Sequence, residues 1–127
     1  MELPAIVTAL ALLEYMYFTF VVGTSRAKHG VMAPATTGDP AWERVYRVQQ
    51  NTLEQLMIFL PSLWIFSTFV SATVGAGVGV VFLVGRIVYF SAYTKEPETR
   101  TIGFLMGFLA TVVLVLGSIG GAIYSLL

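Results

Sequence analysis

The chain has 127 residues, a formal net charge of zero and 57% hydrophobic residues, with a mean hydropathy of +0.82. A soluble domain of this size keeps a large wet surface and does not tolerate so apolar a composition, so we interpret the chain as an integral membrane protein. The balanced charge argues against a nucleic-acid-binding role. The chain contains no cysteine, so the protein itself supplies no disulfide, thiolate nucleophile or thiolate metal ligand.

Four apolar segments are long enough to cross a bilayer, which requires about 20 residues for about 30 Å of hydrocarbon. They predict an all-α, integral membrane four-helix bundle in a single domain over residues 1–127, with helices at about 3–24, 40–72, 74–94 and 101–127. The first segment lacks a basic start and is too long for a signal-peptide core, so we expect it to be retained. Two pairs of glycines in the last segment, 103/107 and 117/121, have the spacing that allows close helix packing.

Basic residues gather in or beside the first and third loops, which lie on one side of the membrane because two crossings separate them. These residues are Arg26, Lys28, Arg44, Arg47, Lys95 and Arg100. The positive-inside rule makes this side cytoplasmic and places both termini outside. We expect a multi-pass protein of the bacterial inner membrane or, in a eukaryote, of an endoplasmic-reticulum type of membrane. His29 is expected in the first loop without neighbouring ligands, so no metal site is predicted.

The second helix has a clear start after a loop rich in turn-forming residues at 30–40. Asp39 suits the N-cap, Pro40 the first helical position, and Glu43 the first turn, where a carboxylate favours the positive end of the helix dipole. Extended to residue 72, this helix would be about 50 Å long and would project beyond the hydrocarbon. Trp42 and Tyr124 are expected in the interfacial belts on opposite sides of the membrane.

Two polar stripes open toward the same leaflet. Arg47, Asn51 and Glu54 recur at i, i+4 and i+7 on the second helix, and the third helix carries Arg86, Tyr89 and Tyr93 at i, i+3 and i+7. Arginines, a carboxylate, amides and phenols together suit a small ligand that has carboxylates and an amine. The alternative is purely structural: Arg47 and Glu54 satisfy each other, and Arg86 pairs with Glu14.

Glu14 is a single carboxylate midway along the first helix. In this setting it resembles the carboxylate of the small proton-coupled multidrug exporters, which binds cations and protons in turn. Its structural role would be that of a buried partner for Arg86 or for another donor. An exporter that uses Glu14, and a non-enzymatic membrane binding protein, are therefore the alternatives to an enzyme.

The polar stripes resemble those of a known family, the membrane-associated proteins in eicosanoid and glutathione metabolism (MAPEG). The second-helix signature Glu43-Arg44-Val45-Tyr46-Arg47-Val48-Gln49, followed by Asn51 and Glu54, is similar to that of the microsomal glutathione transferases and cysteinyl-leukotriene synthase. The approach Thr36-Thr37-Gly38 and the block Phe82 to Arg86, Tyr89, Tyr93 and Arg100 are also similar, so the resemblance covers nearly the whole chain.

The resemblance implies a homotrimer that binds glutathione as co-substrate between subunits near the cytoplasmic face. The implied glutathione-binding residues are Arg26, Arg47, Gln49, Asn51, Glu54, Tyr89, Tyr93 and Arg100, with Arg100 the catalytic residue at the thiol. The chain departs from the synthase at Ala27, where the synthase has a second arginine, and at Gln55, where it has a tyrosine. The resemblance therefore favours a general glutathione transferase or peroxidase over a leukotriene synthase.

The implied mechanism begins with stabilisation of the glutathione thiolate by the Arg100 guanidinium, because a free thiol with a pKa of about 8.5 is mostly protonated at neutral pH. The thiolate then attacks a lipophilic electrophile that arrives from the bilayer, while glutathione arrives from the cytosol. Without the resemblance, Arg100 would be interpreted as a membrane-boundary arginine. Tyr93 is the next candidate donor to the thiol. The expected partners are glutathione, the electrophile, membrane lipid and further copies of the chain.

Overall fold

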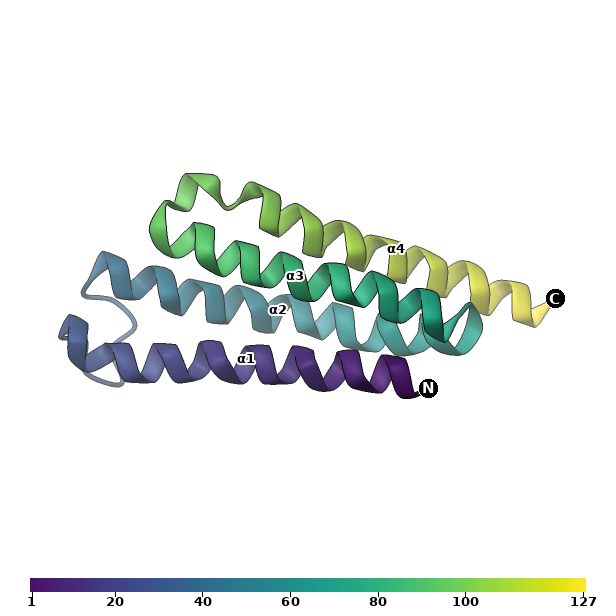
Figure 1. The fold of residues 1–127 in the computed structure, drawn as a ribbon, viewed down its shortest axis with the longest axis horizontal. Helices are drawn as coiled ribbons and strands as arrows, with labels where there is room; N and C mark the ends of the chain where they lie inside the picture. The colour runs from purple at the N-terminus through teal and green to yellow at the C-terminus, as the bar shows by residue number, and fades with distance from the viewer.

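The computed structural model describes residues 1–127 as a bundle of four long helices (Figure 1). The helices are α1 (Glu2–His29), α2 (Pro40–Phe69), α3 (Ala72–Lys95) and α4 (Thr101–Leu126), with a short 3₁₀ helix, η1 (Pro97–Thr99), before α4. All four are long and apolar enough to cross a membrane. Both termini lie at one end of the bundle, and the α1–α2 and α3–α4 connections lie at the other (Figure 1).

The helix boundaries differ from the expected ones mainly at the end of α1. This helix continues to His29 and ends where Gly30 adopts a left-handed conformation (φ 70°), which glycine reaches without steric cost. His29 is therefore in the last turn of a helix, where it was expected in a loop, and its Nδ1 lies 3.4 Å from Asp39 Oδ1. α2 ends at Phe69, three residues before the expected end, and α3 begins at Ala72, two residues before its expected start, so the turn between them consists of Val70 and Ser71.

The start of α2 agrees with its sequence signals, except at Trp42. The Asp39 carboxylate accepts a hydrogen bond from the Trp42 backbone N–H (3.0 Å), and Glu43 accepts one from the Gly38 N–H (3.1 Å). Trp42 itself is fully buried, and its indole N–H donates to the Val22 carbonyl (3.1 Å). The expected place of Trp42 in an interfacial belt is thus wrong: its ring closes the core between α1 and α2.

The core lies along the α2–α3 pair, and both α1 and α4 pack against these two helices. Its centre is the stacked pair Phe59 and Phe82, whose ring centroids are 3.8 Å apart, surrounded by aliphatic side chains such as Leu63 and Leu114. Burying each such side chain contributes about 1.5–3 kcal/mol relative to water, and less where the surroundings are lipid. α1 and α4 therefore flank the α2–α3 pair on different sides.

α3 and α4 approach each other most closely near the end that carries the basic residues. A Cβ atom on Gly103 would overlap the Tyr89 backbone, and one on Gly85 would lie 2.9 Å from the Gly107 backbone nitrogen. The expected packing role of the 103/107 pair is therefore confirmed, within the bundle itself. The contact places the start of α4, with Arg100, beside Tyr89 and Tyr93 of α3.

Candidate functional site

A polar cavity of about 320 Å³ lies at the end of the bundle where α2, α3 and the start of α4 meet. α2 contributes four residues at the spacing of one helical face, α3 contributes two tyrosines one turn apart, and the last residue precedes α4. The lining residues are Arg47, Gln50, Asn51, Glu54, Tyr89, Tyr93 and Arg100. Six of the eight residues predicted for the site thus come together in one cavity.

The charged side chains of this cavity have no ion-pair partners. Arg47, Glu54 and Arg100 are all exposed, and the two ion pairs in the structure involve neither arginine nor the glutamate. The structural alternative, in which Arg47 and Glu54 neutralise each other, is therefore not realised. Arg86 and Glu14 form no ion pair either. Charges of both signs that converge on one cavity, without neutralising each other, make it a candidate site for a polar ligand.

Asn51 adds a second sign that the cavity is incomplete. Its Oδ1 atom is buried and has no hydrogen-bond partner. A buried acceptor left unpaired costs about 1–3 kcal/mol, so such an atom is normally satisfied by a ligand, water or a neighbouring chain. An N–H donor of a bound amide or ammonium group would satisfy it.

A buried arginine packs against the residues that line the cavity. Arg86 is fully buried, donates from Nη2 to Thr52 Oγ1 (2.9 Å), and stacks its guanidinium 4.4 Å from the centre of the Tyr89 ring. The Tyr89 and Tyr93 rings stack in turn, with their centroids 5.4 Å apart. Arg86 thus belongs to the packing under the site and holds the tyrosines in place by its contact with Tyr89.

Arg100 stands at the mouth of the cavity on the connection between η1 and α4. Its Nη1 donates to the Pro97 carbonyl (2.8 Å), and its guanidinium carbon lies 5.9 Å from the centre of the Tyr93 ring. One nitrogen is therefore engaged with the backbone of its own turn. An arginine has five N–H donors, so the remaining ones can face a ligand.

The other two predicted residues, Arg26 and Gln49, do not line this cavity. Arg26 lies near the end of α1, donates from Nη1 to the Ala35 carbonyl (2.8 Å), and stacks 4.5 Å from the centre of the Trp42 ring. Gln49 donates to Thr19 Oγ1 of α1 (3.0 Å). These two residues lie on the α1–α2 side of the bundle, whereas the cavity lies on the side formed by α2, α3 and α4.

Gln50 is the lining residue that sequence reasoning did not select. It lies three residues after Arg47 and four before Glu54, so helical periodicity alone puts it on the same face. Helical periodicity thus indicates Gln50 as a cavity residue, whereas the family signature points to Gln49. The structure assigns the two neighbouring glutamines to different sides of α2.

Comparison with known proteins identifies the relatives of the chain. Residues 4–120 match the MAPEG family. The chain is 47% identical over 123 residues to the uncharacterized protein sll1147 of Synechocystis, covering 97% of this chain and 90% of the relative. It is 38% identical over 120 residues to human microsomal glutathione S-transferase 2 (93% and 81% covered) and 39% identical over 98 residues to guinea pig leukotriene C4 synthase (77% and 65% covered).

The match covers all four helices, the cavity and the α1–α2 side with Arg26 and Gln49. Together with four helices that are each long enough to cross a bilayer, it confirms the expected all-α membrane bundle. The chain therefore belongs to the MAPEG family and is an integral, multi-pass membrane protein.

Proposed function

We propose that the protein is a glutathione-using membrane enzyme that conjugates the glutathione thiolate to lipophilic electrophiles. The observation that carries the proposal is the polar cavity, in which two arginines and a glutamate lack ion-pair partners and a buried amide oxygen lacks a hydrogen-bond partner. Relatives named as a glutathione S-transferase and as leukotriene C4 synthase support the choice of ligand.

The charges of the predicted site match those of the ligand. Arg26, Arg47, Arg100 and Glu54 together carry a formal charge of +2. Glutathione in its thiolate form has two carboxylates, one ammonium and one thiolate, and so carries a charge of −2. Each arginine can take one anionic group and Glu54 can take the ammonium, with bidentate geometry available to the guanidinium–carboxylate pairs. Asn51 Oδ1 then accepts from an N–H group of the tripeptide.

The separation of the residues into two sets favours a site shared between copies of the chain. One set lies on the α2–α3–α4 side and the other, with Arg26 and Gln49, on the α1–α2 side. In a closed ring each copy contacts both neighbours through these two different surfaces, which both include α2. We therefore propose a homotrimer in which α2 faces the symmetry axis, and each glutathione lies between two subunits.

Arg100 is the residue proposed to activate the thiol. A thiol with a pKa of about 8.5 is only a few per cent ionised at neutral pH, and the thiolate is the reactive form. A guanidinium against the sulfur, at a site with little water, favours the anion, and lowering the thiol pKa by two units requires about 2.7 kcal/mol. Tyr93, adjacent to Arg100, is the second candidate donor to the sulfur.

The chemical step joins glutathione from the aqueous phase to a substrate dissolved in the bilayer. The sulfur electron pair forms a C–S bond with an electrophilic carbon dissolved in the bilayer. The leaving group departs with its own electron pair, or, in a conjugate addition, the carbanion takes a proton from water. A lipid hydroperoxide is the alternative substrate for the same thiolate. The hydroperoxide would transfer an oxygen atom to sulfur and leave as the alcohol. Product analysis with a halo-aromatic and with a hydroperoxide measures the balance between the two activities.

A complementation experiment tests the shared site. Arg26→Ala and Glu54→Gln chains carrying different tags are co-expressed, and mixed oligomers are purified in detergent through both tags. If each site takes Arg26 from one subunit and Glu54 from its neighbour, every mixed trimer has one of its three sites with both residues intact, which is about a third of the sites. Isothermal titration with glutathione should then recover about that fraction of tight sites. Mixed oligomers that recover none would contradict a shared site.

The membrane orientation has its own test, because the chain has no native cysteine and any introduced thiol is unique. Six of the seven Lys and Arg residues lie at the end of the bundle that holds the α1–α2 and α3–α4 connections, so we propose that this end faces the cytosol. Cysteines at His29 or Glu98 should react with an impermeant maleimide only from the cytosolic side, and one at Leu127 only from the other side. The reverse pattern would place the cavity away from cytosolic glutathione.

A further inference from the structure

A second, larger hollow lies on the opposite side of the bundle from the polar cavity. This groove between α1 and α3 has a volume of about 860 Å³, and nine of its eleven lining residues are hydrophobic. Several of the residues that line the groove have exposed side chains: Leu13 is 60% exposed, Met16 64% and Phe20 66%. Tyr17 and Phe90 meet edge-to-face at one end of the groove, with their ring centroids 6.1 Å apart.

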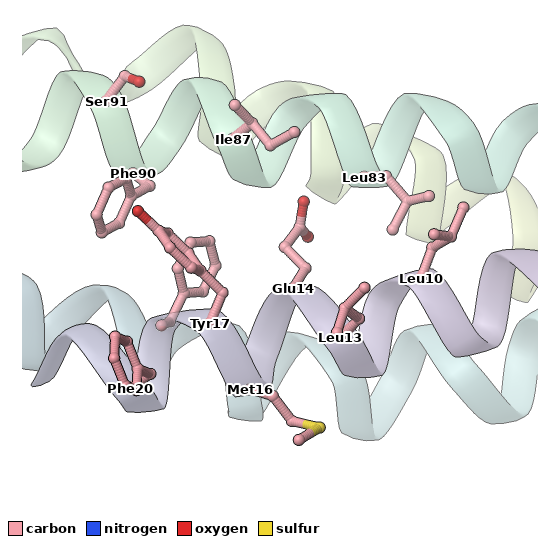
Figure 2. A pocket seen from close by; sticks show the side chains of 11 residues that line it. Leu10, Leu13, Glu14, Met16, Tyr17, Phe20, Leu83, Ile87, Phe90 and Ser91 are labelled. Atoms are coloured by element: carbon pink, nitrogen blue, oxygen red, sulfur yellow. The ribbon is translucent and has the colours of Figure 1, made fainter. Parts of the chain in front are cut away.

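Glu14 is the single charged residue in the groove. Figure 2 shows its side chain projecting from α1 toward α3, into the space between Leu83 and Ile87. One carboxylate oxygen, Oε1, is buried and has no hydrogen-bond partner. Arg86 is near enough to act on it electrostatically, and the Arg86 Nε is likewise buried without a partner, but the two side chains form no ion pair. The carboxyl group of Glu14 therefore has no ion-pair or hydrogen-bond partner at Oε1 within the chain.

The proposed trimer leaves this groove facing lipid. If the α1–α2 side and the α2–α3–α4 side both contact neighbouring subunits, the α1–α3 face, which belongs to neither side, lies on the outer surface of the ring. Glu14 is near the middle of α1, so the groove opens to the hydrocarbon at about mid-depth. Its occupant must then come from the bilayer, and an isolated carboxylate at that depth selects against anions.

We propose that the α1–α3 groove is a binding site for lipophilic amines, with the amine nitrogen at Glu14 and the apolar body along Leu83, Ile87 and Leu10. A neutral amine enters from the lipid, and a protonated Glu14 carboxyl transfers its proton to nitrogen, which leaves an ammonium–carboxylate pair without adding net charge to the bilayer. The rings of Tyr17 and Phe90 provide faces for the alkyl groups on the ammonium. The groove is separate from the glutathione cavity, and this binding does not require catalysis.

Photolabelling of the protein in lipid nanodiscs tests the proposal. The probe is a dimethyl-dodecylamine with a diazirine in the chain, and its matched control replaces nitrogen by CH, so the two differ only in the amine. We expect the amine to label α1 and α3 peptides with at least tenfold higher apparent affinity than the control. Equal labelling by both probes would overturn the proposal and define the groove as a lipid-filled hollow.

Two variants and one matched control complete the test. Glu14→Gln should remove the preference for the amine, and Ile87→Trp, which fills the groove and keeps the carboxylate, should reduce labelling by both probes. Glu54→Gln, the same change in the polar cavity, should leave amine labelling unchanged. Glutathione titration of each preparation reports independently on the polar cavity, so failure of the proposed enzyme and failure of the amine site give different results. An unchanged amine preference in a glutathione-binding Glu14→Gln protein would overturn the assignment of Glu14.

Discussion

Two glutamates, Glu54 and Glu14, lie in very different parts of the molecule. Glu54 lines the polar cavity at one end of the bundle, with Arg47 and Arg100 in the same cavity. Glu14 lies midway along α1 in an apolar groove, near Arg86 but without an ion pair to it. Neither glutamate has an ion-pair partner.

The charges around each carboxylate, and not the carboxylate alone, define the ligand that the site suits. At Glu54 the neighbouring arginines require anions as well as a cation, so the site suits a zwitterionic ligand with several charged groups. Around Glu14, nine of the eleven residues that line the groove are hydrophobic, so a single cation with an apolar body is the complement. If the two sites are independent, a substitution in one should leave the ligand of the other unaffected.

Arg100→Ala should have the largest effect, and only on the chemistry of the polar cavity. Removing one donor to a developing or stabilised anion typically costs about 100- to 1000-fold in rate. Stopped-flow absorbance should show loss of the thiolate signal of bound glutathione in the near ultraviolet and of the proton release that accompanies binding. Glutathione affinity should fall less than the rate, because Arg47, Asn51 and Glu54 hold the rest of the molecule.

Arg100→Lys sharpens this test, since the charge remains while the planar geometry is lost, and we expect partial recovery of the rate. If Arg100→Ala kept the full thiolate signal and turnover, Arg100 would have only a topological role, and Tyr93 would be tested next.

Gly103→Ala should damage the polar cavity through packing. The added methyl would overlap the Tyr89 backbone, and overpacking of this kind costs about 1–3 kcal/mol. Thermal unfolding in detergent should show a lower Tm, and glutathione binding should weaken because Tyr89 is displaced. Gly120→Ala is the matched control in the same helix, because nothing lies within 4 Å of its added Cβ. An unchanged Tm for Gly103→Ala would contradict the close contact of α3 and α4.

Glu54→Gln should weaken glutathione binding by about tenfold, because it replaces a charge-assisted bond to the ammonium with a neutral one. Isothermal titration measures this change. Glu14→Gln is the matched substitution in the groove and should leave glutathione affinity and conjugation of a halo-aromatic unchanged. If both variants lost glutathione binding equally, the two sites would not be independent. Proton-coupled cation efflux that depends on Glu14, without any response to glutathione, would instead favour an exporter.

Gln50→Ala should have the smallest effect in the polar cavity. Its amide lines the cavity, but it carries no charge, so we expect glutathione affinity to fall by about two- to fivefold. Gln49 lies one residue away on the other side of α2, the surface that the proposed trimer places against the cavity of the next subunit. Gln49→Ala tests this surface in the same assay. Loss of binding in the first and not in the second would place the whole site within one subunit.

The sequence predicted the number of helices, their approximate bounds and most of the polar cavity. Long apolar runs and helical spacing are local properties, so the stripe at Arg47, Asn51 and Glu54 could be read directly. Whether Trp42 faces lipid headgroups or the core depends on where α1 packs, which no local pattern records; the indole N–H finds the Val22 carbonyl twenty residues earlier. The missing Arg86–Glu14 pair is of the same kind, because the place of the guanidinium, beside Thr52 and Tyr89, depends on how α2 and α3 pack.

The position of Arg26 has a consequence for the segment between α1 and α2. Its Nη1 holds the carbonyls of Val31 (3.5 Å) and Ala35 (2.8 Å), and its plane covers the Trp42 ring. A guanidinium has further N–H groups on its other edge, so one side chain can tie the connection down and still present donors outward. A lysine, with a single ammonium on a flexible stem, could not hold the connection and bind an anion at the same time. The same side chain therefore holds the α1–α2 connection in place and keeps N–H groups free to bind an anion.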